Sequence, residues 1–195
     1  MSIENEKIKT TTKMKKYISN VFSGSHWKNK LLIFAIILFF VFSTHFGLYI
    51  ANKMGKFNYT SSNWIGINTV YNNGIAFGFL ANSPVITFTI KMMFVLCLLV
   101  CFIISTQKMI YSPLTLMIAG GGANLLNKII NPNEGVLDYI RIKLNLKWLN
   151  FTCNIPDVFI FIGTIWLLIS MIFLFFSSLS HTNFKKSKKN ESSNK

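Results

Sequence analysis

Long runs of apolar residues divide the chain into four segments that can each cross a lipid bilayer. They are residues 31–51, 85–105, 113–130 and 156–176. A helix needs about 20 mostly apolar residues to cross the hydrocarbon core. The first run is too long for the core of a signal peptide, and no small-residue cleavage site follows it closely, so we interpret it as an uncleaved span. The pattern predicts an all-α membrane protein with four transmembrane helices.

A different pattern follows the third run. Apolar and polar residues alternate from Ile140 to Trp148, with Ile140, Ile142, Leu144, Leu146 and Trp148 apolar. A period of two over this length indicates a half-buried strand, with Arg141, Lys143 and Lys147 on its polar face. Residues 53–82 also have a strand-like composition, with a turn signal at Asn72-Asn73-Gly74. We therefore expect a small extracytoplasmic β element beside the helices.

The charge is strongly positive and unevenly distributed. Lys and Arg number 20 against 6 acidic residues, a formal net charge of +14. The lysines gather in the tails 1–30 and 177–195, which flank a four-span membrane domain at 31–176. Because cytoplasmic segments carry the excess of Lys and Arg, both termini are expected in the cytoplasm, with the tails near anionic membrane lipids. No basic domain with interleaved aromatic residues exists, so we expect no nucleic-acid partner.

Neither a metal nor another cofactor is expected. Cys97, Cys101 and Cys153 form an odd set without a CxxC spacing or a nearby His, which supports neither a zinc site nor a disulfide framework. His45 lies near the outer end of the first run, where we expect a partly hydrated side chain. Lys91 interrupts the second run, and we expect its ammonium to extend to the membrane interface.

Asp138 and Asp157 are the only aspartates of the chain. The predicted topology places both on the outer side, near the ends of the third and fourth spans. Acidic groups at membrane level are costly, and they are functional by default. Two carboxylates brought together cannot both ionise easily, which is the basis of aspartyl-protease chemistry. The alternative is structural: Asp157 caps a helix, and Asp138 is a surface residue near a turn.

Four short motifs lie in order within residues 31–176. They are Asn72-Asn73-Gly74-Ile75-Ala76-Phe77, Ala123-Asn124-Leu125-Leu126-Asn127-Lys128, Val136-Leu137-Asp138-Tyr139 and Cys153-Asn154-Ile155-Pro156-Asp157. With the four spans, they resemble the N-x-G-x-A-F, G-N-x-x-D-R, V-x-D-F and F-N-x-A-D motifs of lipoprotein signal peptidase, also called signal peptidase II. The chain departs from the family at Asn127-Lys128, which replaces an Asp-Arg pair, and at Pro156, which replaces an alanine.

The resemblance implies an aspartic endopeptidase in the bacterial cytoplasmic (inner) membrane, with its active site on the extracytoplasmic side. It implies cleavage of prolipoproteins just before a diacylglyceryl-modified cysteine and inhibition by globomycin-like compounds. Asp138 and Asp157 would be catalytic, and Asn72, Gly74, Asn124, Lys128 and Asn154 would bind substrate or orient the site. Lys128 shares a helix face with Asn124, so it should point toward the aspartates if Asn124 does. We expect the enzyme to act as a monomer.

Two rival functions are open from the residues alone. An intramembrane aspartyl protease of the GxGD type uses the same chemistry, but the chain lacks that motif. A non-enzymatic four-span protein, such as a transporter subunit or assembly factor, accounts for the spans equally well. A non-enzymatic function, however, gives no reason for two aspartates to lie at the outer ends of the spans.

Overall fold

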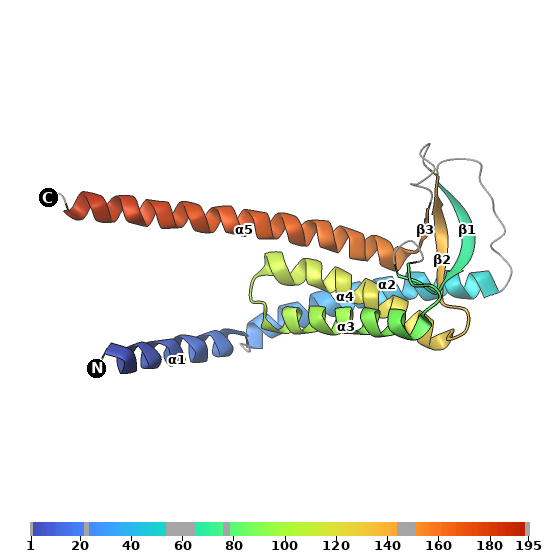
Figure 1. Ribbon diagram of the computed structural model, residues 1–195, viewed down its shortest axis with the longest axis horizontal. Coiled ribbons are helices and arrows are strands. Elements are labelled where there is room, and N and C mark those ends of the chain that lie inside the picture. The colour runs from blue at the N-terminus through green and yellow to red at the C-terminus, as the bar shows by residue number, and fades with distance from the viewer. Residues whose placement is uncertain (1, 22–23, 54–64, 76–78, 144–150, 194–195) are drawn as a thin grey trace.

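The structure is a computed structural model that describes residues 2–21, 24–53, 65–75, 79–143 and 151–193. In chain order its elements are α1 (Ser2–Val21), α2 (Gly24–Lys53), β1 (Ile65–Asn72), α3 (Pro84–Ile104), α4 (Lys108–Ile130), β2 (Val136–Ile142), β3 (Phe151–Cys153) and α5 (Ile155–Ser193). The long helices lie side by side, with a small sheet at one end and both termini at the other (Figure 1). The predicted class, a helical membrane protein with a small β element, is confirmed.

Four of the described helices are long and apolar enough to cross a membrane. The candidate spans are Trp27–Ile50, Pro84–Ile104, Lys108–Ile130 and Ile155–Ser180. The predicted start of the third span differs most from the structure. The third helix begins at Lys108, so Pro113 lies inside it rather than at its start. Within the predicted N-terminal tail, residues 2–21 form helix α1.

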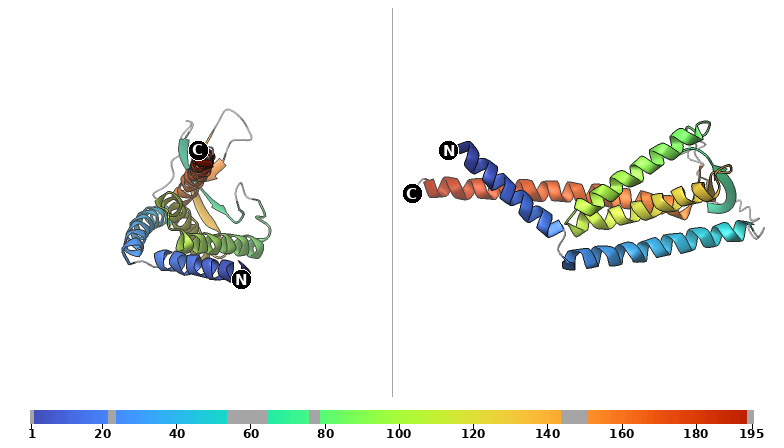
Figure 2. Two further views of the ribbon diagram at one scale, coloured as in Figure 1. Left: turned by 90° about the vertical axis from the view of Figure 1, so that its left-hand side faces the viewer. Right: turned by 90° about the horizontal axis from the view of Figure 1, so that it is seen from below.

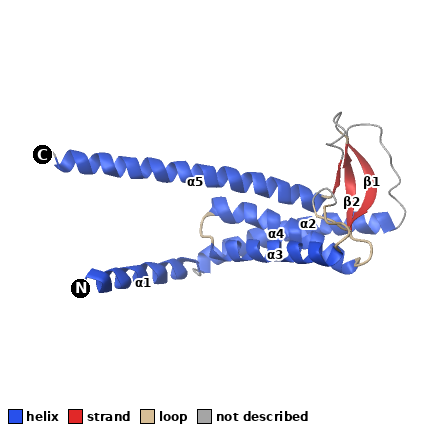
Figure 3. Ribbon diagram, viewed as in Figure 1, coloured by secondary structure: helices blue, strands red, loops and turns tan. Residues whose placement is uncertain are grey.

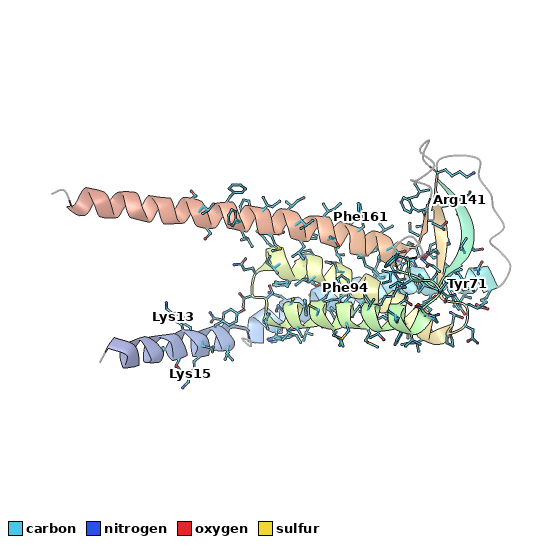
Figure 4. The ribbon with its side chains drawn as sticks, viewed as in Figure 1. Lys13, Lys15, Tyr71, Phe94, Arg141 and Phe161 are labelled. Atoms are coloured by element: carbon cyan, nitrogen blue, oxygen red, sulfur yellow. The ribbon has the colours of Figure 1, made fainter. Side chains whose placement is uncertain are left out.

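Helix α4 is the buried centre of the bundle. Most of its side chains are buried, and α2, α3 and α5 all pack against it (Figure 2). Small residues allow this close approach: a Cβ on Gly120 would collide with the Pro156 carbonyl oxygen and lie 2.9 Å from Ile160 Cγ1. The other three spans expose large apolar side chains on their outer surfaces, including Phe94 and Phe161 (Figure 4). Lipid can cover such a surface at no hydrophobic cost, which is typical of membrane helices.

The sheet has the order β1-β2-β3, and both pairs are antiparallel (Figure 3). The central strand runs from Val136 to Ile142, so it begins earlier than the alternating pattern predicts, and Leu144, Leu146 and Trp148 lie outside the described residues. The predicted alternation of burial is wrong for the described part. Residues 136–139 are all buried, and residues 140–142 are all half-buried. A strand covered on both faces has no reason to alternate.

Candidate active site

Asn154 lies between β3 and α5 and joins the sheet to the bundle. Its Oδ1 accepts a hydrogen bond from the backbone N–H of Asp157 at 2.9 Å. In return, Asp157 Oδ2 accepts one from the backbone N–H of Asn154 at 3.1 Å. This reciprocal pair is a capping box, which satisfies two N–H groups that a helix start leaves without partners. The spacing Asn-x-x-Asp therefore begins α5 at Ile155 and fixes Asp157 in its first turn.

Asp138 lies on β2, with its side chain 4% exposed. Asn154 Nδ2 donates to its Oδ1 at 2.9 Å, and Asn72 Nδ2 donates to its Oδ2 at 3.2 Å. Asn72 is in turn oriented by the backbone N–H of Gly74, which donates to Asn72 Oδ1 at 2.8 Å. Both side-chain oxygens of Asp138 are thus held by amides that come from other elements.

A glycine brings the start of β2 against the end of β1. Gly135 has a φ of +98°, and a Cβ at this position would lie 2.7 Å from the backbone oxygen of Asn72. Both the positive φ and the close backbone approach require a residue without a side chain. Gly135 therefore places Asn72 next to Val136, two residues before Asp138.

Asn124 connects the second aspartate to the same group. Its Nδ2 donates to Asp157 Oδ1 at 2.8 Å, while its Oδ1 accepts from Asn154 Nδ2 at 3.0 Å. Asn154 therefore contacts Asp138, Asp157 and Asn124 together. Of the residues that the sequence predicted, six are joined by direct hydrogen bonds: Asn72, Gly74, Asn124, Asp138, Asn154 and Asp157.

The carboxyl of Asp138 sits in an environment that favours its protonated form. Burial raises its pKa to about 7, and the neighbouring charge of Asp157 acts in the same direction. The Asn72 and Asn154 hydrogen bonds and the Lys91 charge oppose this effect. Burial wins because an ionised carboxylate loses more hydration than these groups restore. At neutral pH Asp138 is consequently near its midpoint and can donate or accept a proton.

Two neighbours of Asp138 stay neutral. Burial raises the pKa of Tyr139 to about 12 and that of Cys153 to about 11. The Tyr139 hydroxyl has a structural use, since its oxygen accepts a hydrogen bond from the backbone N–H of Ile155 at 3.1 Å. Proton transfer near pH 7 is therefore left to the carboxyls.

Lys128 is placed differently from the predicted asparagines. Its ammonium donates to Asn73 Oδ1 at 2.7 Å and to the Pro132 carbonyl at 2.9 Å. Neither partner is an aspartate. Lys128 joins the sheet end of α4 to the turn after β1, beside Asn72 and Gly74. Its part in binding substrate stays a prediction.

Two buried residues near the site have roles that sequence reasoning missed. Asn127 is fully buried, and its Oδ1 accepts from the backbone N–H of Leu137 at 3.0 Å, which attaches β2 to α4. The sequence did hold a signal for this role, because Asn127 lies one helical turn after Asn124 and so on the same face of α4. His45 is also fully buried, with its ring centroid 6.1 Å from that of Tyr139. The expectation that His45 is partly hydrated is wrong, because the sheet end of the molecule covers it.

Within the described ranges, no three His, Cys, Asp or Glu side chains gather closely enough to hold a metal ion. The donor set around the aspartates consists of carboxylates and amides. Such a set can orient and activate a water molecule and hold a polar peptide group by hydrogen bonds.

The sequence is similar to that of signal peptidases, and the fold is similar to that of a bacterial membrane enzyme. A sequence profile of the family described as Signal peptidase (SPase) II matches residues 33–173. A curated lipoprotein signal peptidase from Mycoplasmoides gallisepticum (strain R(low / passage 15 / clone 2)) is 26% identical over 160 residues, which cover 78% of this chain and 50% of that protein. The chain thus spans about half the length of this curated relative.

Two solved structures of a bacterial membrane enzyme, obtained by the in meso method, have a similar fold. Their TM-scores are 0.60 and 0.58, each at 22% identity. The matches cover 77% of this chain and 89% and 94% of the solved chains. At this identity the similarity shows the shared fold.

Proposed function

The chain belongs to the signal peptidase II family, and on this premise we propose that it is an aspartic endopeptidase that removes signal peptides from prolipoproteins. The observation that carries the proposal is the position of Asn154. Its side-chain amide donates to the Asp138 carboxyl and its backbone N–H donates to the Asp157 carboxyl, so one residue holds both the acid and the base. A helix cap alone would not require Asn154 to hold the buried carboxyl of Asp138 as well.

We assign the base to Asp157 and the acid to Asp138. Asp157 lies in the first turn of α5, where unpaired N–H groups favour a negative charge, and it accepts hydrogen bonds from Asn124 Nδ2 and from the Asn154 backbone. Asp138 has a pKa near 7 and so carries a proton readily. The pair then holds one proton at neutral pH, as the reaction requires.

The reaction follows from this charge state. The Asp157 carboxylate removes a proton from water as the water oxygen attacks the scissile carbonyl carbon. Asp138 gives its proton to the carbonyl oxygen, and a tetrahedral intermediate forms. Asp157 then returns its proton to the leaving nitrogen as the C–N bond breaks, and the hydroxyl proton of the intermediate restores Asp138. Each carboxyl ends as it began.

Membership of the family supports the identity of the substrate and the place of action. We propose that the substrate is a prolipoprotein cleaved just before a diacylglyceryl-modified cysteine, that globomycin-like compounds block the site, and that the protein works as a monomer. We also propose that it resides in the bacterial cytoplasmic membrane with its aspartates on the extracytoplasmic side. The exposed apolar surfaces of α2, α3 and α5 support contact with lipid.

The test is cleavage of a labelled precursor peptide that carries a diacylglyceryl cysteine. We expect the wild type to cut before this cysteine and to leave the unlipidated peptide intact. Asp138→Asn and Asp157→Asn should each reduce cleavage by at least about 1,000-fold, because each removes one partner of the proton transfers. Glu134→Gln is the matched control: Glu134 is exposed and ion-paired with Lys53 at 3.1 Å. Cleavage that survives in either aspartate variant would refute the proposal.

A further inference from the structure

Lys91 lies on the inner face of α3, which packs against α4. The buried residues of α3 follow a helical spacing that places them on one face of the helix: Thr87, Val95, Leu98 and Phe102. Lys91 falls four residues after Thr87 and four before Val95, on this face. Its side chain is half-buried, whereas the residues of the opposite face, such as Met93, are exposed. The ammonium therefore belongs to the interior of the bundle and not to the lipid-facing surface.

The contacts of Thr87 and Val95 fix the level of Lys91 along the bundle. Val95 lies against Gly121 of α4, where a Cβ would be 2.7 Å from Val95 Cγ2. From this contact, one turn toward the sheet leads to Lys91 on α3 and to Asn124 on α4, because the two helices are antiparallel (Figure 1). Thr87, one turn further, donates to the Asn73 carbonyl at 3.1 Å. Lys91 thus lies level with Asn124, whose amide holds Asp157.

The charge of Lys91 reaches the aspartates. It lowers the pKa of Asp138 against the effects of burial and of Asp157. Lys91 has no hydrogen bond or ion pair with any other residue that the structure describes. Its half-buried position on the face of α3 that packs against α4 differs from that of a lysine side chain surrounded by lipid.

We propose that Lys91 is a positioning residue of the active site, whose ammonium keeps the aspartate pair in its singly protonated form at neutral pH. The proposal rests on the proposed proteolytic function and deepens it. Without a cation at this point, a buried pair would hold its second proton to a higher pH, and fewer molecules would carry the carboxylate that activates water.

The other titratable groups around the pair do not supply this charge. Lys128 on α4 is engaged by Asn73 and Pro132. Tyr139 on β2 and Cys153 on β3 are neutral at physiological pH. His45 of α2 packs against the Tyr139 ring. Lys91 is thus the cation on α3 that is left to face the carboxyls.

Loss of the Lys91 charge should shift the pH dependence of cleavage upward. A positive charge stabilises a carboxylate, so its removal raises the pH at which the pair releases each proton. Both limbs of the profile of kcat/KM against pH should then move upward in Lys91→Met, by about one pH unit. At a fixed pH below the acidic pKa, an upward shift of one pH unit reduces kcat/KM about tenfold. Lys91→Arg keeps the charge and should keep the profile.

The experiment compares Lys91→Met, Lys91→Gln and Lys91→Arg with wild type. Lys108→Met is the control, because Lys108 is an exposed lysine at the start of α4, far from the sheet. Two readouts are used: the pH profile of cleavage of the lipidated peptide, and the infrared titration of the protonated carboxyl band, which needs no turnover. We expect upward shifts in both neutral variants and none in Lys91→Arg or Lys108→Met.

The two readouts separate the possible failures. An unchanged carboxyl midpoint in the folded neutral variants would overturn the role of Lys91, even if the wild type cleaves the peptide. A shift of the carboxyl midpoint in Lys91→Arg as large as in Lys91→Met would show that the shape of the side chain matters and not its charge. This result would also overturn the proposed role of Lys91. If the wild type cleaves nothing while the carboxyl midpoint depends on Lys91, the proposed function fails and the electrostatic coupling stands.

Discussion

At the scale of single residues, Asp157 has two uses that looked like alternatives. It closes a capping box with Asn154 at the start of α5, and it also belongs to the hydrogen-bonded group that includes Asp138. The cap is what gives the carboxylate its position, since a side chain held by a backbone N–H cannot turn freely. A structural interpretation of Asp157 and a catalytic one are therefore compatible.

The two aspartates should not be equivalent, and single substitutions can show it. Asp157 lies at a helix N-terminus, which favours its negative charge by about 0.3–1 kcal/mol. Asp138 has no helix end, and its pKa is raised to about 7 by burial and then by the charge of Asp157. We expect the carboxyl left in Asp138→Asn to titrate lower than the one left in Asp157→Asn. The latter should itself titrate below about 7, because the amide that replaces the Asp157 carboxylate carries no charge to raise it.

Infrared titration of the two single variants measures these midpoints. In the wild type only the shared values of the pair can be observed, so the variants are needed. The opposite order of midpoints would reverse the assignment of acid and base. It would leave the pair itself intact.

The site residues show what the sequence could and could not predict. Asn72, Asn124 and Asn154 were selected by their motifs, and all three hydrogen-bond to an aspartate. The burial of His45 and the part played by Asn127 could not be predicted, because they depend on which elements cover them. The half-buried position of Lys91 could not be predicted for the same reason: a lysine in an apolar run has the same local sequence whether it faces lipid or a neighbouring helix.

At the scale of elements, the close packing of α4 against α5 sets the geometry of the site. Asn124 and Asp157 come from these two helices, and Gly120 lies one turn from Asn124 at the point where α4 meets the Pro156 carbonyl. Gly120 allows the backbones of the two helices to approach closely at this point. The strand was predicted less well: it begins at Val136, before the alternating pattern, and residues 140–142 are all half-buried instead of alternating.

Gly120→Ala should weaken this packing. The added methyl group would collide with the Pro156 carbonyl, which belongs to the backbone and cannot turn away. We expect destabilisation by about 1–3 kcal/mol, together with reduced cleavage as Asp157 moves from Asn124. Thermal unfolding of the purified proteins in detergent measures the first effect and the lipidated-peptide assay the second.

Gly122→Ala is the matched control two residues away. A Cβ at Gly122 meets nothing within 4 Å, so this variant should be as stable as the wild type or slightly more stable, since alanine favours a helix. Equal melting temperatures for the two variants would contradict the packing described for α4 and α5.

At the scale of the whole molecule, the two ends of the bundle are closed in different ways. At the end near the termini, the buried ammonium of Lys30 donates to the Phe102 carbonyl at 2.7 Å and to the Ile103 carbonyl at 3.2 Å, and so caps α3. At the other end lies the sheet, and Asn72, Asn124 and Asn154 hydrogen-bond to the two aspartates there. The four spans could be predicted from the sequence because long apolar runs are a strong signal. The chain order of a bundle does not reveal which helix is central, and α4 was not identified as such.

The distribution of charge between the two ends of the molecule predicts its orientation in the membrane. The termini and the aspartates lie at opposite ends of the bundle (Figure 1), and most of the lysines lie in the two terminal segments. Since Lys and Arg are retained on the cytoplasmic side, the sheet should face outward. The measurement uses Lys13→Cys and Glu134→Cys, each in a chain whose Cys97, Cys101 and Cys153 are replaced by alanine. Both side chains are exposed, at opposite ends.

A membrane-impermeant maleimide applied to intact cells should label Glu134→Cys and leave Lys13→Cys unlabelled until the membrane is opened. A retained ability to cleave the lipidated peptide is the control that the alanine replacements leave the fold intact, because Cys153 is buried next to Asn154. Labelling of Lys13→Cys in intact cells would place the aspartates on the cytoplasmic side. A precursor that has already crossed the membrane could not reach them there, so this result would contradict both the topology and the proposed substrate.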